Sequence, residues 1–323
     1  MIISFIVTTQ LNEIDFKKTL KSIKTQTLKD YEMIIVVDSS EEGDDSIGYK
    51  EVRKIMLENS NIKLIKNSLD QGKANCWNDA MAIAEGKYIK FINDGEEISD
   101  NFVEALATLI ESKDQPDIIE YTTSLKYKTR SYESSLFLRN NKVYDLNTEF
   151  EPLAYTSELV FNKIYKTEIA KANKLKFRRN QRYDLLFVYK FLSKAKTYIY
   201  IADEIKSSYP VRPVDYSMFD TVNQWTHIFN WFRETNDYKV NEDYVKYAYY
   251  KLLVHRWLWN LQWEGNKVLI KKGVEFVEMK FKKEKRIKFM KSNKVFLKAK
   301  DTKFQDMVEN FESHIKLIGR VTK

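Results

Sequence analysis

The sequence has 323 residues, with 54 Lys or Arg against 46 Asp or Glu, and its formal net charge is +8 at pH 7. This length suits one large domain or two smaller ones, and the scarcity of glycine and proline argues against long disordered tracts. A single cysteine excludes an internal disulfide and fits the reducing cytoplasm. No apolar run approaches the roughly 18 residues of a membrane-spanning helix, and the opening "MIISFIV" is too short for a signal peptide, so we expect a soluble cytoplasmic protein or a peripheral one at the inner face of the membrane.

The first hundred residues alternate between two patterns. Short apolar runs rich in β-branched residues predict buried strands at residues 2–9, 31–40, 61–67 and 87–94. Amphipathic segments between them predict helices at residues 13–26, 49–60 and 72–86. Gly86 is the predicted C-cap of the last of these helices. Alternating strands and helices indicate βαβ units, so the predicted fold class is α/β, with a mostly parallel sheet covered by helices on both faces.

The rest of the chain is mixed and then helical. Apolar patterns predict strands at residues 116–128 and 196–204, and helices at residues 157–173 and 182–195. Beyond residue 214 the chain predicts long, aromatic-rich helices at residues 219–236 and 241–263, whose aromatic residues we interpret as packing core rather than a base-stacking platform. We therefore predict a first domain over residues 1–213, with halves 1–116 and 117–213, and a basic C-terminal helical region over residues 214–323.

Acidic residues cluster where two predicted strands end. Asp38 lies near the end of the second strand, while Asn93, Asp94, Glu96 and Glu97 lie at or just beyond the end of the fourth. Ligands of open parallel sheets bind at the carboxyl ends of the strands, and Mg²⁺ or Mn²⁺ prefers carboxylate oxygens. The cluster is therefore either a solvated turn or a site for a divalent cation and a phosphate-bearing ligand. A glycine-rich dinucleotide turn, a Walker A sequence and a Cys/His zinc pattern are all missing from the sequence, which argues against those three kinds of site.

A basic stripe runs from Lys267 to Lys300, where 13 Lys or Arg are opposed by three Glu. Such a stripe attracts phosphate in nucleic acid or in anionic lipid, although a solvated helix face is an equal alternative. Apolar residues interleaved with the cations would let the stripe lie on anionic lipid; they are Val268, Leu269, Phe276, Phe281, Phe289 and Phe296. Nucleic acid is the least favoured partner, because the sequence contains no recognisable nucleic-acid-binding module.

Four segments, in order, resemble the family-2 inverting glycosyltransferases with the GT-A fold, over roughly Ile3 to Pro213. The segment "ISFIVTTQLNEIDFKKTLKSIKTQTLKDYEMIIVVDSS" resembles the family's opening strand, helix and nucleotide-binding strand. The segment "DQGKANCWNDAMAIAEGKYIKFINDGEEIS" is similar to the stretch that leads to the D-x-D motif. "FNKIYKTEIAKANKLKF" followed by "YDLLFVYKFL" resembles the "NK.Y" helix and the acidic helix, and "YIADEIKSSYPVRP" resembles the strand and basic turn after them.

The resemblance implies a glycosyltransferase that uses a nucleotide-sugar donor, most simply a UDP-sugar. Thr8 and Asp38 would then contact the base and its ribose. Asn93 and Asp94, at the D-x-D site, would face the donor. Asp94, with Glu96 beside it, would also ligate a divalent cation, Mn²⁺ or Mg²⁺, that holds the diphosphate.

The resemblance also implies how the sugar would be transferred. Asp184 would be the general base that deprotonates a hydroxyl of a glycan, glycolipid or protein acceptor, with inversion, and Arg212 would stabilise the leaving diphosphate. Gly95 stands where the family commonly has an acid, which motivates a second interpretation: a catalytically silent relative that binds a glycan or a partner protein. The aromatic-rich terminal helices make a homodimer reasonable.

Overall fold

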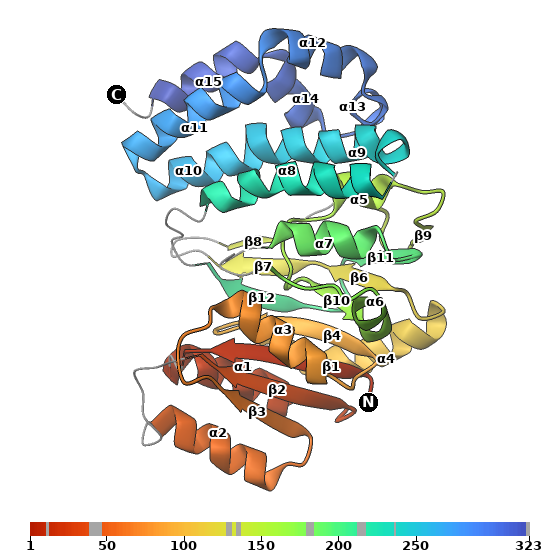
Figure 1. Ribbon diagram of the computed structural model, residues 1–323, viewed down its shortest axis with the longest axis vertical. Coiled ribbons are helices and arrows are strands. Elements are labelled where there is room, and N and C mark those ends of the chain that lie inside the picture. Colours follow the sequence, from red (N-terminus) through yellow and green to blue (C-terminus); the bar gives the residue numbers. More distant parts are fainter. Residues whose placement is uncertain are drawn as a thin grey trace. The chain divides into compact units, whose positions relative to one another are not determined.

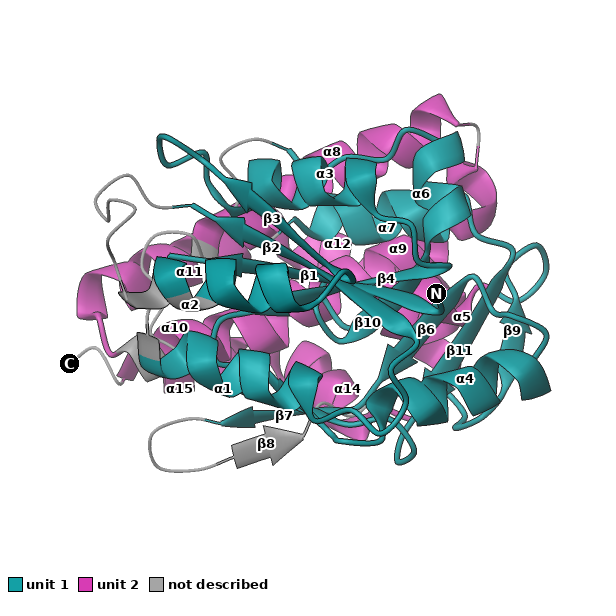
Figure 2. Ribbon diagram, turned by 90° about the horizontal axis from the view of Figure 1, so that it is seen from below, with its two compact units in different colours: residues 1–149, 157–212 teal, residues 150–156, 213–323 magenta. Residues whose placement is uncertain are grey.

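The computed structural model describes residues 1–10, 13–38, 47–126, 131–133, 137–178, 184–211, 218–235 and 237–320. The chain forms two compact units, which Figure 2 colours separately: an α/β unit of residues 1–149 and 157–212, and a helical unit of residues 150–156 and 213–323. Within the described ranges, none of the helices combines the length and the apolar character needed to cross a bilayer.

The described part of the α/β unit contains a large sheet with strand order β3-β2-β1-β4-β10-β6-β11-β9. These strands are β1 (Ile3–Thr9), β2 (Tyr31–Val37), β3 (Ile62–Lys66), β4 (Tyr88–Asn93), β6 (Ile118–Tyr121), β9 (Val143–Asp145), β10 (Lys163–Lys166) and β11 (Thr197–Ile201). The β3-β2-β1-β4 half is wholly parallel, whereas β10 runs antiparallel to both β4 and β6. The predicted α/β fold class is confirmed.

Helices cover both faces of this sheet. Figure 2 shows α3 and α6 on one side of the strands and α1 and α4 on the other. One face carries α1 (Glu13–Lys24), α2 (Ile47–Glu58) and α4 (Phe102–Ser112), whose apolar residues share a core cluster with Phe5 and Val7 of β1. The other face carries α3 (Lys73–Ile83), α6 (Thr167–Ala172) and α7 (Leu185–Leu192). Because both faces are covered, β1 and β2 are buried along their whole length, as their unbroken apolar runs predict.

The helix predicted at residues 157–173 is wrong over its first half. Residues 163–166 form β10, which lies between β4 and β6, and only residues 167–172 are helical. Lys163 is fully buried there, and its ammonium lies 3.4 Å from the carboxylate of Glu120 on β6. A buried lysine in a four-residue strand gives no apolar alternation, so the helical spacing of the neighbouring residues dominated the sequence pattern.

Two further predictions need correction. The strand predicted at residues 116–128 is two strands: β6 belongs to the large sheet, and β7 (Thr123–Lys126) belongs to a small sheet with β5 (Glu97–Ile98), β8 (Ser131–Glu133) and β12 (Ser207–Pro210). Gly86 is not the C-cap of α3, because the helix ends at Ile83 and Ala84 is its cap. A Cβ on Gly86 would lie 2.5 Å from the backbone nitrogen of Ser4, so the glycine permits close approach of two backbones.

The described part of the helical unit consists of helices only, drawn from turquoise to blue in Figure 1 apart from the earlier helix α5. They are α5 (Glu151–Tyr155), α8 (Met218–Glu234), α9 (Tyr238–Lys251), the π-helix η1 (Leu252–Trp257), α10 (Leu258–Glu264), α11 (Lys267–Lys280), α12 (Lys283–Ser292), α13 (Lys294–Lys298), α14 (Thr302–Glu309) and α15 (Phe311–Arg320). The short α5 belongs here because Tyr155 packs edge-on against Tyr247 of α9, with ring centroids 5.4 Å apart.

The aromatic residues of the basic stripe are core residues of this helical unit. Phe281, Phe289 and Phe296 are buried in one cluster, and Leu269 and Phe276 pack against it. They are therefore not available for insertion into lipid, contrary to the sequence interpretation, whereas Val268 is 68% exposed. The lysines between residues 267 and 300 are all exposed, and Arg286 is buried in an ion pair with Glu312.

Candidate active site

The carboxyl ends of β2, β1 and β4 bring the predicted donor-binding residues to one edge of the sheet. Thr8 of β1 is in register with Asn93 of β4, and the backbone N–H of Asp38 donates to the carbonyl of Thr9 over 2.9 Å. Asp38 and Asp94, 56 positions apart in the chain, thus lie at the same edge, with only the end of β1 between their strands. This is the edge at which ligands of open α/β sheets bind.

The Asp38 carboxylate holds the loop that leads into α3. It accepts hydrogen bonds from the Asn67 side chain at 2.8 Å, from the backbone N–H of Gln71 at 2.8 Å and from that of Gly72 at 2.9 Å. Burial alone would raise the pKa of Asp38, but these hydrogen bonds outweigh burial and hold its pKa below the usual range. Asp38 is therefore an ionised anchor of the loop.

Asp94 has one carboxylate oxygen that is buried and forms no hydrogen bond with the described residues. Burial raises the pKa of Asp94 to about 6, although hydrogen bonds from the Thr9 side chain and the Gln10 backbone, together with the charge of Lys73, act in the opposite direction. Its Oδ1 atom is buried and has no hydrogen-bond partner among the described residues, and the same holds for Oγ1 of Thr8. Two buried oxygens without partners at one sheet edge are candidate ligand contacts.

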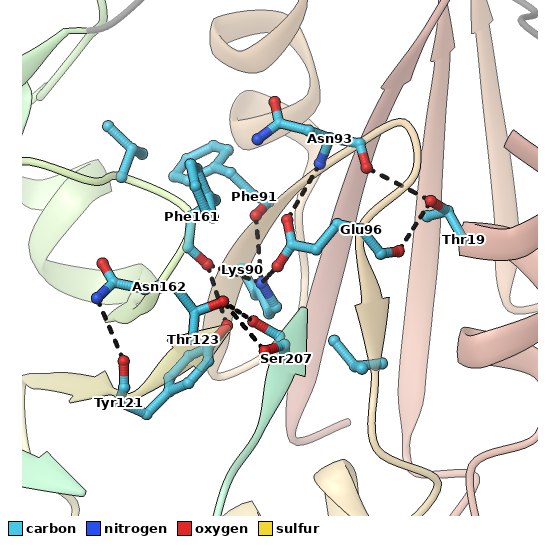
Figure 3. A network of polar contacts seen from close by, with 12 residues as sticks. Thr19, Lys90, Phe91, Asn93, Glu96, Tyr121, Thr123, Phe161, Asn162 and Ser207 are labelled. Atoms are coloured by element: carbon cyan, nitrogen blue, oxygen red, sulfur yellow. Dashed lines mark hydrogen bonds and ion pairs between the residues drawn. The ribbon is translucent and has the colours of Figure 1, made fainter. Parts of the chain in front are cut away.

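Glu96 does not share this position. Its carboxylate forms an ion pair of 2.6 Å with Lys90, and both side chains are fully buried. Figure 3 shows the pair between the strands, with the Lys90 ammonium also donating to the carbonyl of Phe161 at 2.8 Å. Full burial raises the pKa of Glu96 and lowers that of Lys90, while their mutual attraction acts against both shifts. Glu96 is thus committed to the core, and we withdraw it as a cation ligand.

Gly95 shapes the turn between these two acids. Its φ is +85°, and its N–H donates to Oγ1 of Thr19 at 2.9 Å. A Cβ at this position would lie 2.8 Å from the ring of Pro210 and 3.4 Å from the Asp15 carboxyl group. The sequence has glycine where an acid was expected because neither the backbone conformation nor the space would accept a side chain.

Asp184 is the N-cap residue of α7 and is only 1% exposed. Its Oδ2 accepts the backbone N–H of Arg178 at 2.7 Å, and its Oδ1 lies 3.8 Å from the Arg178 guanidinium. Burial raises the pKa of Asp184, against the opposing effects of Arg178. Next to Arg178, Phe177 exchanges two hydrogen bonds with the Asn78 side chain of α3, so Asp184 is linked through this segment to the helix that starts at the same carboxyl edge as Asp38.

Lys73 is a site residue that the sequence analysis missed. It is the first residue of α3, and its Nζ lies 2.5 Å from Oδ1 of Asn93. Its position directly after a glycine that follows a predicted strand was the available signal, but a lysine at a helix start is common on any surface. Arg212, which the resemblance assigned to the leaving diphosphate, lies outside the described residues.

The described residues supply little of a divalent-cation site. None of their His, Cys, Asp and Glu side chains form a group of three that could hold a metal ion. Glu96 is paired with Lys90, and Asn93 Oδ1 is engaged by Lys73, which leaves Oδ1 of Asp94 as one carboxylate ligand. One carboxylate fits a cation such as Mg²⁺ only when substrate phosphates and water supply the other ligands.

A cavity of about 350 Å³ lies beside the small sheet of the same unit. Its lining includes the hydroxyl and charged side chains of Ser99, Thr122, Ser124, Asp203 and Lys206. Thr122 and Ala202 come directly after β6 and β11, and these strands run parallel to β4. The cavity therefore borders the same carboxyl edge as Asp94.

Comparisons with known proteins agree with this architecture. The model of a family described as "Glycosyl transferase family 2" matches residues 4–171. The crystal structure of S. aureus TarS 1-349 in complex with UDP-GlcNAc matches with a TM-score of 0.66 and 15% identity, over 100% of this chain and 90% of that one. The crystal structure of S. aureus TarS matches with a TM-score of 0.57 and 19% identity, over 96% of this chain and 55% of that one. At these identities the likeness is one of fold. Among curated proteins, none matches.

Proposed function

The chain belongs to glycosyl transferase family 2, and from this membership we propose that it transfers a sugar from a UDP-sugar to a hydroxyl group of a glycan, glycolipid or protein, with inversion. The observation that carries the proposal is that Asp38 and Asp94 lie at the same carboxyl edge of the sheet. The choice of UDP is supported by the similar fold of a protein that was crystallised with UDP-GlcNAc.

The donor would bind at this edge through groups that lack partners. The buried oxygens of Thr8 and Asp94 are acceptors that base N–H and ribose hydroxyl groups would satisfy. Leaving such a group unpaired costs about 1–3 kcal/mol, so satisfying it favours the bound state. Asp38 would act indirectly, because its carboxylate already holds the Gln71–Gly72 backbone beside the donor.

Transfer would need a base on the acceptor side, and we assign Asp184. Its Oδ1 has no hydrogen-bond partner among the described residues. As Asp184 takes the acceptor proton, the acceptor oxygen forms a bond to the anomeric carbon. The bond from that carbon to the diphosphate oxygen breaks, and its electron pair leaves with UDP. Such base catalysis contributes about 10²- to 10⁴-fold. The hydroxyl-lined cavity beside the small sheet is the proposed acceptor side.

A cation, Mn²⁺ or Mg²⁺, would bind through Asp94 with oxygens of the donor diphosphate as further ligands, and it would supply positive charge to the leaving group when bound. Arg212 is proposed to act on the same diphosphate.

The exposed lysines between residues 267 and 300 are proposed to attract an anionic membrane surface by charge alone, because the neighbouring phenylalanines are core residues. Sedimentation of the full chain with anionic vesicles at low and high salt tests this: salt-sensitive binding supports it, and no binding contradicts it.

Release of UDP from a panel of UDP-sugars, with GDP-sugars for comparison, tests the proposed activity. Wild type should release UDP from at least one UDP-sugar when acceptor is present, and Asp184→Asn should lower that rate about 10²- to 10⁴-fold without weakening UDP binding. The second candidate, a silent relative, is favoured by Gly95, where the acid is missing and has no space. It would be supported if wild type released no nucleotide from any donor.

A further inference from the structure

Lys73 is held in a defined place at the donor edge. Its Nζ lies 2.5 Å from Oδ1 of Asn93 and 5.6 Å from the centre of the Trp77 ring. Asn93 is the last residue of β4, and Trp77 is one helical turn further along α3. The ammonium is thus positioned by two elements that also form the edge where the donor would bind.

Two backbone N–H groups directly before the helix are already committed. The backbone N–H groups of Gln71 and Gly72 point to the Asp38 carboxylate. An anion that arrives at this edge would therefore find these two N–H groups engaged by Asp38, and the Lys73 ammonium is the positive charge that follows them in the chain. The charge of Lys73 also acts on its surroundings, since it favours the ionised forms of both Asp94 and Glu96.

The edge needs such a cation, because a nucleoside diphosphate brings at least two negative charges to a place where Asp38 and Asp94 are already acidic. The described residues contain no group of three side chains that could hold a metal ion by themselves, so a cation at this edge would depend on the diphosphate for further ligands. A positioned ammonium supplies positive charge without a metal ion, by charge-assisted hydrogen bonds to phosphate oxygens.

We propose that Lys73, positioned by Asn93 and Trp77, binds the diphosphate of the nucleotide-sugar donor and remains on it as the leaving group departs. This inference depends on the proposed function, since it requires a nucleoside diphosphate at the donor edge. It assigns to a protein side chain a positive charge that would otherwise depend on a metal ion at the D-x-D site, where Gly95 replaces an acid. Asn93 then acts as a positioning residue for the ammonium rather than as an acid substitute.

The test compares uridine with UDP, which differ by the diphosphate, in EDTA so that only protein cations contribute. Ligand-observed NMR titrations give both dissociation constants for wild type and for Lys73→Met. Wild type should bind UDP more tightly than uridine, and Lys73→Met should weaken UDP binding about 10- to 100-fold while the uridine constant stays within about twofold. Lys54→Met, which removes a lysine that is 76% exposed on α2, should change neither constant.

Lys73→Gln separates the charge from a merely structural tether. Glutamine keeps a donor that can bind Asn93 but has no charge, so it should behave like Lys73→Met, whereas Lys73→Arg should retain most of the UDP affinity. Unchanged preference for UDP over uridine in Lys73→Met, or full rescue by Lys73→Gln, would overturn the inference. Wild type that binds UDP no more tightly than uridine would also overturn it. Wild type that binds neither would contradict the proposed function itself.

Discussion

Lys90 and Glu96 form a 2.6 Å ion pair in which both side chains are fully buried, and the same carboxylate accepts the backbone N–H of Asn93 at 3.3 Å. The pair therefore connects the strand to the turn that carries Asp94. Thr19 of α1 closes the other side of this turn, because its hydroxyl donates to the carbonyl of Glu96 at 2.9 Å. The geometry of the turn that carries Asp94 thus depends on a buried ion pair.

Removing one member of this pair should be costly. Lys90→Met leaves the Glu96 carboxylate buried without its partner, and breaking a buried pair in this way costs about 3–5 kcal/mol. The double variant Lys90→Met/Glu96→Gln removes both charges and should recover part of the loss. Urea unfolding monitored by circular dichroism measures both. A single variant as stable as wild type would show that the pair does not hold the turn.

Gly95 should tolerate no side chain. Gly95→Ala combines a φ of +85° with a contact of 2.8 Å to Pro210. Gly265→Ala is a matched control, because Gly265 also has a positive φ, +68°, but nothing lies within 4 Å of its Cβ position. Backbone strain of this kind costs about 1–3 kcal/mol in either variant. Because of the added clash, Gly95→Ala should lose more unfolding free energy than Gly265→Ala. Equal losses of unfolding free energy in the two variants would mean that space at Gly95 is not limiting.

Stability should depend on pH through Asp94. Burial raises the pKa of Asp94 from 3.8, the ordinary value for an aspartic acid, to about 6 in the folded protein. The folded state then holds the proton more tightly than the unfolded state, so this contribution to stability is present at low pH and is lost as pH rises from about 4 to 6. A shift of about two units corresponds to roughly 3 kcal/mol.

The comparison of wild type with Asp94→Asn isolates this effect, since asparagine does not titrate. Wild type should lose up to about 3 kcal/mol relative to the variant between pH 4 and pH 7, as measured by urea unfolding across that range. A stability difference that does not change with pH would place the Asp94 carboxyl in a better solvated environment than the structure shows.

Asp38 should control the backbone before α3. Asp38→Ala leaves the N–H groups of Gln71 and Gly72 without the carboxylate that accepts them, at a cost of about 1–3 kcal/mol. Amide hydrogen exchange at these two residues should accelerate accordingly. Asp70→Ala is the comparison, because Asp70 also accepts from Gly72, at 2.9 Å, but at an exposed position, so its effect should be smaller. Equal exchange in both variants would refute the anchoring role of Asp38.

The sequence predicts the location of the candidate site better than the orientation of the side chains in it. Unbroken apolar runs identify β1, β2 and β4, and the polar residues that follow them must then meet at the carboxyl edge. The two acids of the 93–97 turn look equivalent in the sequence, yet Asp94 faces the edge and Glu96 points into the core. That difference depends on Lys90, a charged residue inside an apolar run, whose burial only the assembled sheet reveals.

The sequence pattern did not reveal strand β10 or the contact between Lys73 and Asn93, and the reasons are related. β10 is short and contains the buried Lys163, whose partner Glu120 comes from a strand 43 positions earlier. Lys73 stands out only because of its contact with Asn93, which lies 20 positions later in the chain. Local sequence patterns do not indicate such long-range pairs. For the same reason, the prediction that the phenylalanines of the basic stripe face lipid was wrong.

Binding of UDP at the Asp94 edge is the central claim, and a thermal unfolding titration with UDP tests it most directly. UDP at about 100 times its dissociation constant should stabilise wild type by roughly 2.7 kcal/mol, and Asp94→Ala should lose most of that stabilisation while remaining folded. No stabilisation of wild type by UDP, or an equal stabilisation of the Asp94→Ala variant, would contradict the account.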